Sequence, residues 1–457
     1  MWKPIINRHT PHKIKAIINA LKKDICSGHL ASGERLPTQT ELANCLGIAK
    51  STVARAYQEA NSVGLIKTIV GSGSFVSGEG DQFLSAVGGG NLGLLDLRVD
   101  YPLYDFDPSL SETLSQIALE DSQHLLTYQE HAGREEFRNA GLKWLQLNGV
   151  DCSVDDIVIT SGAQHAITVC LSSIAKAGQT VLVEELTYPG IKESAEMLGI
   201  NLISLSMDEN GIIPQALLNA LYDNENVKAL YTSPTVQNPT TILTPTERRV
   251  EIADICQKHG IYILEDDIYR LFSDVRPEPY ANLLPELTFF IASFSKVVCG
   301  GLRIAYVRVP SAVLKIVRRR LLATHWALPP LMAEIATRWV NNGTASSTLL
   351  TKKEEAGKRQ KLAKKIIGQK LILGNLSSFY VWIKLPAEWS TEVFISEAFN
   401  NNVAVLGNGT FSVSSNSSKP GVRLCLGAAP NIAALEAGLL KLAEMLKDGP
   451  SAAMGVI

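Results

Sequence analysis

Residues 260–309 read GIYILEDDIYRLFSDVRPEPYANLLPELTFFIASFSKVVCGGLRIAYVRV. Three short apolar runs in this stretch, rich in β-branched and aromatic residues, are typical of buried strands, and the first two end in polar side chains. Four similar runs come earlier in the chain, and they are DIVIT (156–160), TVLVEE (180–185), NLISLS (201–206) and VKALYT (227–232). Helical patterns, such as those of residues 163–178 and 247–260, lie between the runs. This alternation predicts a large α/β domain built on a mainly parallel sheet that helices cover.

Polar residues cluster at the carboxyl ends of the predicted strands, which is where α/β sheets bind ligands. PTVQNP (234–239) follows one strand, EDDIY (265–269) ends the next, and SFSK (293–296) ends a third, with Arg303 shortly after it. Together these motifs resemble those of the fold type I pyridoxal phosphate enzymes, in particular the class I/II aminotransferases. The resemblance extends over residues 96–447 and implies that this part of the chain binds pyridoxal phosphate.

The resemblance implies a role for the central residues of these motifs. Lys296 would form a Schiff base with the aldehyde of the cofactor, its amine kept reactive by burial and neighbouring positive charge. A carboxylate opposite the pyridine nitrogen keeps that nitrogen protonated and makes the ring an electron sink. The Asp-x-x-Tyr spacing of the family assigns this position to Asp266 in preference to Glu265 or Asp267.

Other residues would hold the remaining groups of the cofactor. Asn238 and Tyr269 would hydrogen-bond its phenolic oxygen, and Tyr188 would stack on its ring, the alternative being a packed core tyrosine. The phosphate would be bound by backbone N–H groups at the start of a helix and by hydroxyl and guanidinium groups. The residues of this phosphate site are Ser161, Gly162, Ala163, Ser293, Ser295 and Arg303.

Two further matches lie far from these motifs in the sequence. Tyr128 matches a tyrosine that reaches the phosphate of the neighbouring subunit in the family, which implies a homodimer. Arg423, in GVRLCLG, matches the arginine that clamps a substrate carboxylate in a bidentate pair, a role that lysine fills poorly. A salt-bridged surface arginine is the alternative for Arg423.

The chain departs from the aminotransferase pattern at two places. Asp100, in DYP, stands where the family commonly has a glycine close to the substrate carboxylate, and a carboxylate there would repel an α-carboxylate. Gly300 stands where a proline is usual after the Schiff-base lysine.

Charge is uneven along the chain, whose net charge is −2. Residues 1–80 contain ten Lys or Arg and five Asp or Glu, giving +5, whereas the remaining residues contain 33 against 40, giving −7. A small basic segment is the footprint expected of a domain that binds a polyanion.

The pattern within this basic segment predicts a winged helix-turn-helix. Apolar residues recur at helical spacing from Lys13 to Ser27, and Thr38 with Glu41 forms a capping box at the start of a second helix that Gly47 ends. A third helix begins near Lys50, and GLIKTIVGSGSFVS (64–77) alternates as a hairpin.

The run GERLPTQTELANCLGIAKSTVARAYQEANSVGLIKTIVGSGSFV (33–76) resembles the winged helix-turn-helix of the GntR family of bacterial transcription regulators, and the resemblance covers residues 10–77. The third helix would enter the major groove of double-stranded DNA with the residues at its start. The predicted DNA-binding residues are Arg35, Thr38, Lys50, Ser51, Thr52, Arg55, Gly71, Ser72 and Gly73. A solvated basic helix start with Ser51 as a cap is the alternative, and Thr40 stands where the family often has a basic residue.

The two resemblances together are those of the MocR subfamily of bacterial regulators. The predicted domains are a DNA-binding domain (1–76), a linker (77–95), an aminotransferase-like domain with a smaller C-terminal α+β subdomain (96–447) and a tail (448–457). The resemblance implies a transcription regulator whose large domain senses pyridoxal phosphate, or an amine or amino acid that exchanges with Lys296, and head-to-tail dimers on repeated DNA sites.

Two other functions are the alternatives. A working aminotransferase could carry the DNA-binding domain as an accessory, because all the cofactor residues are present. A domain that has lost the cofactor and serves only as a dimerisation scaffold conflicts with the presence of Asp266, Tyr269, Lys296 and Arg303.

Composition excludes several other classes of protein. The hydrophobic fraction of 46% is that of a packed globular chain, and no run approaches the roughly 18 to 20 apolar residues that span a membrane. The N-terminus lacks the apolar core of a signal peptide, so we expect a cytoplasmic protein without a membrane partner. The seven cysteines and eight histidines show no metal-ligand spacing, so we expect neither disulfides nor a metal.

Overall fold

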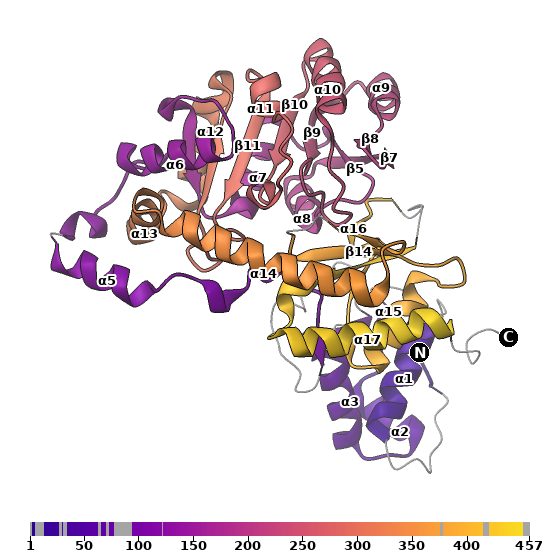
Figure 1. The fold of residues 1–457 in the computed structure, drawn as a ribbon. Coiled ribbons are helices and arrows are strands. Elements are labelled where there is room, and N and C mark those ends of the chain that lie inside the picture. The colour runs from indigo at the N-terminus through magenta and orange to yellow at the C-terminus, as the bar shows by residue number, and fades with distance from the viewer. Residues whose placement is uncertain are drawn as a thin grey trace.

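The computed structural model in Figure 1 describes residues 2–4, 13–26, 30, 34–62, 65–69, 73–76, 94–120, 122–374, 378–414 and 420–450. Gly71 and Ser72 of the predicted wing, residues 77–93 of the predicted linker and residues 451–457 of the predicted tail lie outside the described residues.

A seven-stranded sheet forms the centre of the large domain, with the strands in the order β4-β12-β11-β10-β9-β5-β6. The strands are β4 (Ile157–Thr160), β5 (Thr180–Glu184), β6 (Asn201–Leu205), β9 (Val227–Thr232), β10 (Tyr262–Asp266), β11 (Thr288–Ser293) and β12 (Ala305–Arg308). They coincide with the seven runs that the sequence predicted, and the α/β fold class is confirmed. β12 is antiparallel to both of its neighbours, whereas the other pairs are parallel.

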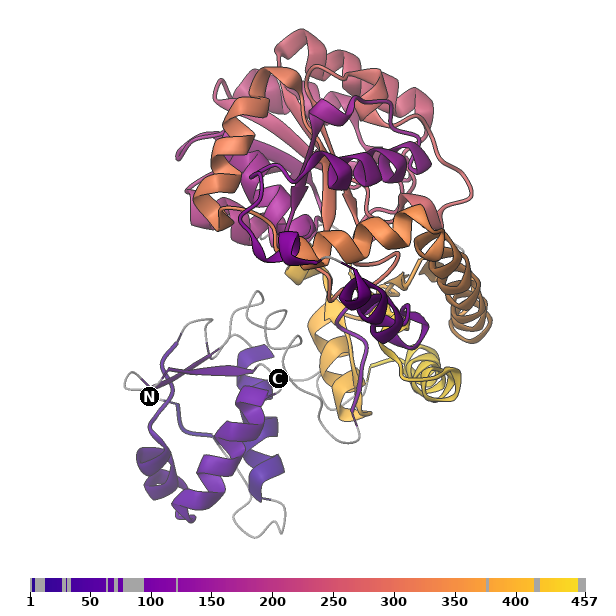
Figure 2. The same ribbon diagram turned by 90° about the vertical axis from the view of Figure 1, so that its left-hand side faces the viewer.

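Helices cover both faces of this sheet, as both views show (Figures 1 and 2). The first three residues of β4 illustrate why its sequence does not alternate between apolar and polar residues: Ile157 and Ile159 join one hydrophobic cluster, and Val158 joins the cluster on the opposite face. One face packs against α7 (Ala163–Ile174), α8 (Pro189–Leu198) and α12 (Leu314–His325), and the other against α6 (Glu135–Leu147), α9 (Pro214–Asp223), α10 (Thr246–His259), α11 (Tyr280–Leu283) and α13 (Pro330–Asn341).

A smaller domain follows the long helix α14 (Thr344–Ile367). Its four-stranded sheet has the order β13-β14-β17-β16, and β3 of the chain's earlier part pairs with β15 beside it. The elements are β3 (Leu95–Asp96), β13 (Ile372–Leu373), β14 (Tyr380–Lys384), α15 (Thr391–Asn400), β15 (Val403–Ala404), β16 (Leu406–Gly407), α16 (Asn408–Phe411), β17 (Gly421–Cys425) and α17 (Ile432–Asp448). The predicted C-terminal α+β subdomain is therefore confirmed.

Short elements complete the large domain. They are α5 (Leu110–Leu119), the hairpin β7 (Met207–Asp208) and β8 (Gly211–Ile212), and the 3-10 helices η1 (Tyr104–Phe106), η2 (Gln123–Leu126), η3 (Val154–Asp156), η4 (Arg270–Phe272) and η5 (Ser311–Val313). A further 3-10 helix, η6 (Leu426–Ala428), lies between β17 and α17 of the small domain.

The N-terminal domain is the predicted winged helix-turn-helix. It contains α1 (Lys13–Cys26), α2 (Gln39–Leu46), α3 (Lys50–Ser62) and the antiparallel pair β1 (Ile66–Ile69) and β2 (Gly73–Val76). The capping box forms as expected, because Thr38 Oγ1 accepts a hydrogen bond from the Glu41 N–H and the Glu41 carboxylate accepts one from the Thr38 N–H at 2.8 Å. Gly47 ends α2 with φ of +64°.

The N-terminal domain lies beside the small domain and away from the seven-stranded sheet (Figures 1 and 2). α1 contacts α15 of the small domain. Among the described residues, no helix has both the length and the apolar character needed to span a membrane.

Candidate functional site

A cavity of about 170 Å³ lies at the carboxyl ends of β9, β10 and β11, between the large domain and β17 of the small domain. Ten of the residues that the sequence predicted for this site line it, and they are Ala163, Tyr188, Asn238, Asp266, Tyr269, Ser293, Ser295, Lys296, Arg303 and Arg423. Ser161 and Gly162 precede this group directly in the chain. The structure therefore brings together residues that are as much as 260 positions apart, from Ala163 to Arg423.

Asp266 is the one of three consecutive acids that lines the cavity. Its Oδ2 accepts a hydrogen bond from the Tyr231 hydroxyl at 2.6 Å, whereas its Oδ1 is buried without a hydrogen-bond partner among the described residues. Burial raises the pKa of Asp266 to about 6. An unpaired buried carboxylate oxygen is suited to accept a hydrogen bond from a protonated ring nitrogen.

The two neighbouring acids serve the interior of the large domain. Glu265 is fully buried and lies 3.3 Å from the guanidinium of Arg249. Asp267 accepts a hydrogen bond from the Thr235 hydroxyl at 2.5 Å and pairs with Arg270 at 3.4 Å. Both carboxylates therefore have partners elsewhere, as expected of a strand whose side chains alternate between its faces.

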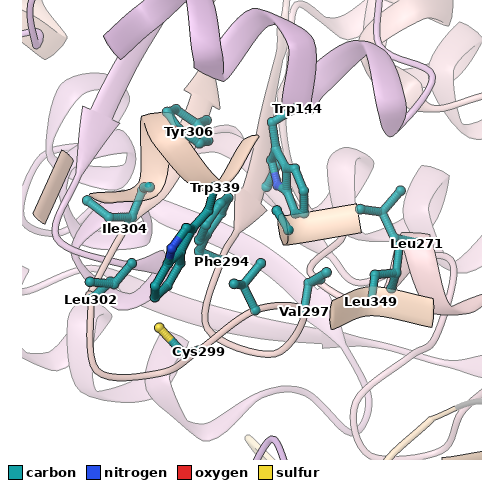
Figure 3. Close-up of a cluster of buried hydrophobic side chains, with 14 of the residues drawn as sticks. Trp144, Leu271, Phe294, Val297, Cys299, Leu302, Ile304, Tyr306, Trp339 and Leu349 are labelled. Atoms are coloured by element: carbon teal, nitrogen blue, oxygen red, sulfur yellow. The ribbon is translucent and has the colours of Figure 1, made fainter. Parts of the chain in front are cut away.

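The loop that carries Lys296 is anchored in the largest core. Phe294 and Val297, on either side of the loop's polar residues, are buried in a cluster with Trp144 and Trp339, as Figure 3 shows. The Phe294 and Trp144 rings are 4.7 Å apart. This packing fixes the backbone on both sides of Lys296, so the amine at the end of its side chain is directed into the cavity.

The amine of Lys296 contacts Asp100, a pairing that the sequence did not predict. Nζ lies 3.1 Å from Asp100 Oδ2 and also donates a hydrogen bond to the Asp100 carbonyl oxygen. The Tyr269 hydroxyl donates to the same Oδ2. Asp100, expected to face a substrate carboxylate, thus also occupies the immediate surroundings of Lys296 and Tyr269.

Residues around the start of α7 are suited to hold an anion. Gly162 precedes the helix with φ of +82°, and a Cβ at this position would lie 2.5 Å from Arg303 Nη2, so the close approach of the guanidinium requires glycine. Arg303 donates to Ser295 Oγ at 3.2 Å, and the Ser295 N–H donates to Ser293 Oγ at 3.1 Å. The helix N-terminus, the hydroxyls and the guanidinium together favour a phosphate-like anion.

His165, in the first turn of α7, modifies this site. Its Nδ1 accepts a hydrogen bond from the Ser161 N–H at 3.1 Å, and its Nε2 lies 2.8 Å from Thr324 Oγ1. Burial, with a smaller effect of His325, lowers the pKa of His165 to about 4, which keeps the ring neutral and able to accept. The Ser161 N–H is thus already paired within the chain.

Arg423 projects from β17 toward the cavity and is buried, so it is no surface arginine. Its Nη1 donates to Asn238 Oδ1 and its Nη2 to the Arg98 carbonyl oxygen, both at 2.8 Å. The guanidinium lies 4.8 Å from the centre of the Phe411 ring. These contacts orient Arg423, and through it they also fix the amide of Asn238.

A second missed network supports the turn before Asn238. Glu184, at the end of β5, accepts hydrogen bonds from Thr232 Oγ1 at 2.6 Å, the Ser233 N–H at 3.0 Å and Gln237 Nε2 at 2.8 Å. Burial raises the pKa of Glu184 to about 7. The strand pattern could have placed Glu184 at the carboxyl end of β5. It could not have identified its partners, which lie on β9 and in the turn that follows it.

Tyr128 does not line the cavity of its own chain. Its side chain is 91% exposed, and its ring lies 5.9 Å from that of Trp326, which is also exposed. Leu119 and Leu126, in the neighbouring elements α5 and η2, are exposed as well, at 89% and 83%. The segment from α5 to Tyr128 thus presents several large apolar side chains to solvent.

The predicted DNA-contacting residues lie on the exposed surface of the N-terminal domain. Lys50, Ser51 and Arg55 are exposed on α3, and Thr52 is half-buried, whereas the opposite side of the helix packs into the domain core. Arg35 is exposed and lies against Gly73 of the wing, where a Cβ would come within 3.1 Å of its Nε. Thr38 uses its hydroxyl to cap α2.

One group of possible metal ligands comes together that the sequence spacing did not indicate. Ligand atoms of His124, Glu136 and Glu334 lie within 4.8 Å of one another on the surface of the large domain. Glu136 also pairs with Arg134 at 3.0 Å, and Glu334 with Arg338 at 2.6 Å. Both acids therefore already have cationic partners.

Two family models match the chain. The model for aminotransferase class I and II matches residues 94–442, and that for the gntR family of bacterial regulatory proteins matches residues 13–76. The uncharacterized HTH-type transcriptional regulator YdeF of Bacillus subtilis is 30% identical over 455 residues, which cover 98% of this chain and 97% of that protein.

Other similar proteins match the large domain or most of the chain. The HTH-type pyridoxine biosynthesis transcriptional regulator PdxR of Corynebacterium glutamicum is 24% identical over 67% of this chain and 68% of that protein. The solved structure of a kynurenine aminotransferase of Pyrococcus horikoshii has a TM-score of 0.72 and 20% identity, covering 78% of this chain and 91% of that one. At this level of identity the likeness shows the fold alone.

Proposed function

Because the chain belongs to the aminotransferase class I and II family and carries a GntR-type DNA-binding domain, as the MocR-type transcription regulators do, we propose that its large domain senses a small amine through pyridoxal phosphate. The observation that carries the proposal is the convergence of Lys296, Asp266 and Arg303 on one cavity. The same chain holds the DNA-binding helix, so binding in the cavity and binding to DNA are properties of one molecule.

The cavity residues fit pyridoxal phosphate. The unpaired Oδ1 of Asp266 matches the need of a pyridinium nitrogen for an acceptor, and the close approach of Gly162 and Arg303 matches the need of the phosphate for donors. When bound, pyridoxal phosphate supplies an aldehyde that primary amines attack and a ring that withdraws electrons. Lys296 supplies the resident amine at this position.

The protein's own groups position the reacting amine. Asp100 holds the Lys296 ammonium by an ion pair, and Tyr269 donates to the same carboxylate, so three groups share one small volume. Arg423 and Asn238 also line the cavity, where Arg423 Nη1 donates to Asn238 Oδ1, and the Arg423 guanidinium would attract an acidic group of a ligand. A ligand that enters this volume must rearrange the contacts of Asp100 with Lys296.

The homodimer is part of the proposal. Arg303, at the anion site, is exposed in a single chain, and Tyr128 projects into solvent from a surface with other exposed apolar side chains. A second copy that covers this surface would bury those side chains and bring its Tyr128 toward the anion site. Both consequences favour association.

We propose that the small domain transmits the effect of the ligand to the DNA-binding domain. Arg423 links the cavity to β17 of the small domain, and α15 of that domain contacts α1. A ligand that binds one arrangement of the small domain more tightly would shift the population of arrangements and so the spacing of two DNA-binding domains in a dimer.

A working aminotransferase is the second candidate function, favoured by the complete set of cofactor-facing residues. The contacts of Asp100 oppose it, because a carboxylate beside Lys296 would repel the α-carboxylate of an ordinary amino-acid substrate. We therefore expect binding of amines without efficient multiple turnover.

The test uses the purified full chain and its Lys296→Ala variant. Pyridoxal phosphate should give the wild type a visible absorption band that the variant lacks, and footprinting should show protection of DNA upstream of its own gene. Amines that change the wild-type spectrum should also change the footprint. A wild type that takes up no pyridoxal phosphate would contradict the sensing proposal, and steady-state turnover of about 1 to 10 per second would favour the aminotransferase.

A further inference from the structure

We propose that Asp100 selects the effector class: a primary amine that carries a second hydrogen-bond donor, ammonium or hydroxyl, and no carboxylate on its amine-bearing carbon. The inference rests on the proposed function, since it names the ligand of the same cavity.

The first observation is the incomplete pairing of the Asp100 carboxylate. Its side chain is only 10% exposed, and both Lys296 Nζ, at 3.1 Å, and the Tyr269 hydroxyl contact the same oxygen, Oδ2. Oδ1 is buried and has no hydrogen-bond partner in the described parts of the chain. A buried carboxylate oxygen without a donor is unfavourable, so a ligand that supplies the donor gains affinity at this position.

The second observation is the proximity of the Asp100 carboxylate to the Lys296 amine. Oδ2 of the same carboxylate lies at hydrogen-bond distance from Lys296 Nζ, so an amine that takes the place of Nζ brings its own substituents next to Asp100. A second donor on a short chain could therefore reach Oδ1 while the amine occupies the position of Nζ.

The surrounding charges oppose a carboxylate at the same place. A carboxylate on the amine-bearing carbon would lie beside Asp100, and like charges placed together in a poorly solvated site reduce affinity steeply. Arg423 offsets part of this repulsion, because each Nη group gives only one of its two N–H donors, to Asn238 or to the Arg98 carbonyl oxygen, and its Nε has no hydrogen-bond partner among the described residues. The cavity thus favours a cationic or neutral second group near Asp100.

Three four-carbon amines test the inference on the full chain loaded with pyridoxal phosphate. They are putrescine, which has a second ammonium, butylamine, which has no second group, and α-aminobutyrate, which has the excluded carboxylate. Dissociation constants are measured by calorimetry and by the change in the visible spectrum. We expect putrescine to bind on the order of 10- to 100-fold more tightly than α-aminobutyrate, with butylamine between them.

Two variants show whether Asp100 causes the preference. Asp100→Asn removes the charge and should reduce the ratio of the putrescine and α-aminobutyrate constants to within about threefold, whereas Asp105→Asn, at an exposed acid five residues later, should leave it unchanged. Asp100→Gly serves if the asparagine variant unfolds, and should tighten α-aminobutyrate binding.

The outcomes separate this inference from the proposed function. A wild type that shows the visible band but binds α-aminobutyrate as tightly as putrescine would overturn the role of Asp100 and leave the cofactor proposal intact. An unchanged ratio in Asp100→Asn and Asp100→Gly would do the same. A wild type without the band would overturn both.

Discussion

Asp266→Asn should have opposite effects on the free protein and on its affinity for pyridoxal phosphate. In the free protein Asp266 is 5% exposed and one of its oxygens has no partner among the described residues, so the ionised form is poorly stabilised. Burial raises its pKa from the ordinary value of 3.8 to about 6. A difference of about two pKa units corresponds to roughly 3 kcal/mol.

The sign of this effect follows from proton binding. Between pH 3.8 and about 6 the folded chain holds a proton on Asp266 that the unfolded chain has released, so the stability of the wild type falls as pH rises through this window. Above pH 6 the full cost of the buried charge is present. Asp266→Asn removes the titration, so at pH 7.5 the variant without cofactor should be as stable as the wild type or more so, by up to roughly 3 kcal/mol.

Pyridoxal phosphate, in contrast, should bind the wild type more tightly than Asp266→Asn. If Asp266 holds the pyridinium nitrogen as proposed, the pair would be a charge-assisted hydrogen bond that the neutral amide of asparagine cannot reproduce, and losing such a bond costs about 1.5 to 3 kcal/mol, or roughly 10- to 100-fold in affinity. Urea unfolding of the free chain at pH 4 and 7.5 and titration with pyridoxal phosphate measure the two effects. The exposed acid Asp254 gives the matched control, Asp254→Asn. Unchanged cofactor affinity in Asp266→Asn would refute the assignment of Asp266.

Substitutions at three other places test further parts of the structure. Gly162→Ala places a Cβ 2.5 Å from Arg303 Nη2 at φ of +82°, whereas the control Gly178→Ala has similar backbone strain at φ of +80° and no atom within 4 Å of its Cβ. Only Gly162→Ala should weaken pyridoxal phosphate binding, by about 10-fold or more in a titration, and equal losses in both variants would assign the effect to backbone strain. Lys50→Ala or Arg55→Ala should weaken DNA binding by about 1 to 3 kcal/mol if the side chain contacts a base, or lower the slope of log affinity against log salt concentration by about one if it contacts a phosphate. Gln58→Ala, exposed on the same helix, should do neither, and equal behaviour of all three variants would remove α3 from the interface. The carboxylate of Glu265 is fully buried 3.3 Å from the Arg249 guanidinium, and Arg249→Met removes this cation. The free energy of unfolding in urea should fall by about 3 to 5 kcal/mol, and a loss below about 1 kcal/mol would show that the pair contributes little.

The elements of the fold could be predicted from the sequence because their signals are local. The seven strands of the large sheet are continuous apolar runs, as β4 shows, and the capping box of α2 lies within four consecutive residues. The direction of β12 could not be predicted, because an apolar run carries no information about which neighbour it pairs with. In the structure it pairs antiparallel with both β11 and β4.

Only the site residues that belong to short sequence motifs could be predicted. Lys296, Asp266 and Arg303 belong to short motifs at strand ends, and the structure places them around one cavity. The pairing of Lys296 with Asp100 joins residues 196 positions apart, and no local pattern specifies such a contact. The acceptor role of His165 was missed for another reason: the sequence shows where α7 starts but not that its first turn folds back on Ser161.

The most direct test of sensing through Lys296 compares amine-dependent DNA binding in the wild type and in Lys296→Ala. The affinity of the full chain for DNA upstream of its own gene is measured with pyridoxal phosphate present, as a function of putrescine concentration. We expect the amine to change the DNA affinity of the wild type at least about fivefold, the lower range of allosteric coupling, and to leave that of Lys296→Ala unchanged. An equal response in both proteins would contradict sensing through Lys296, and so would a wild-type affinity that does not respond to an amine whose binding changes its spectrum.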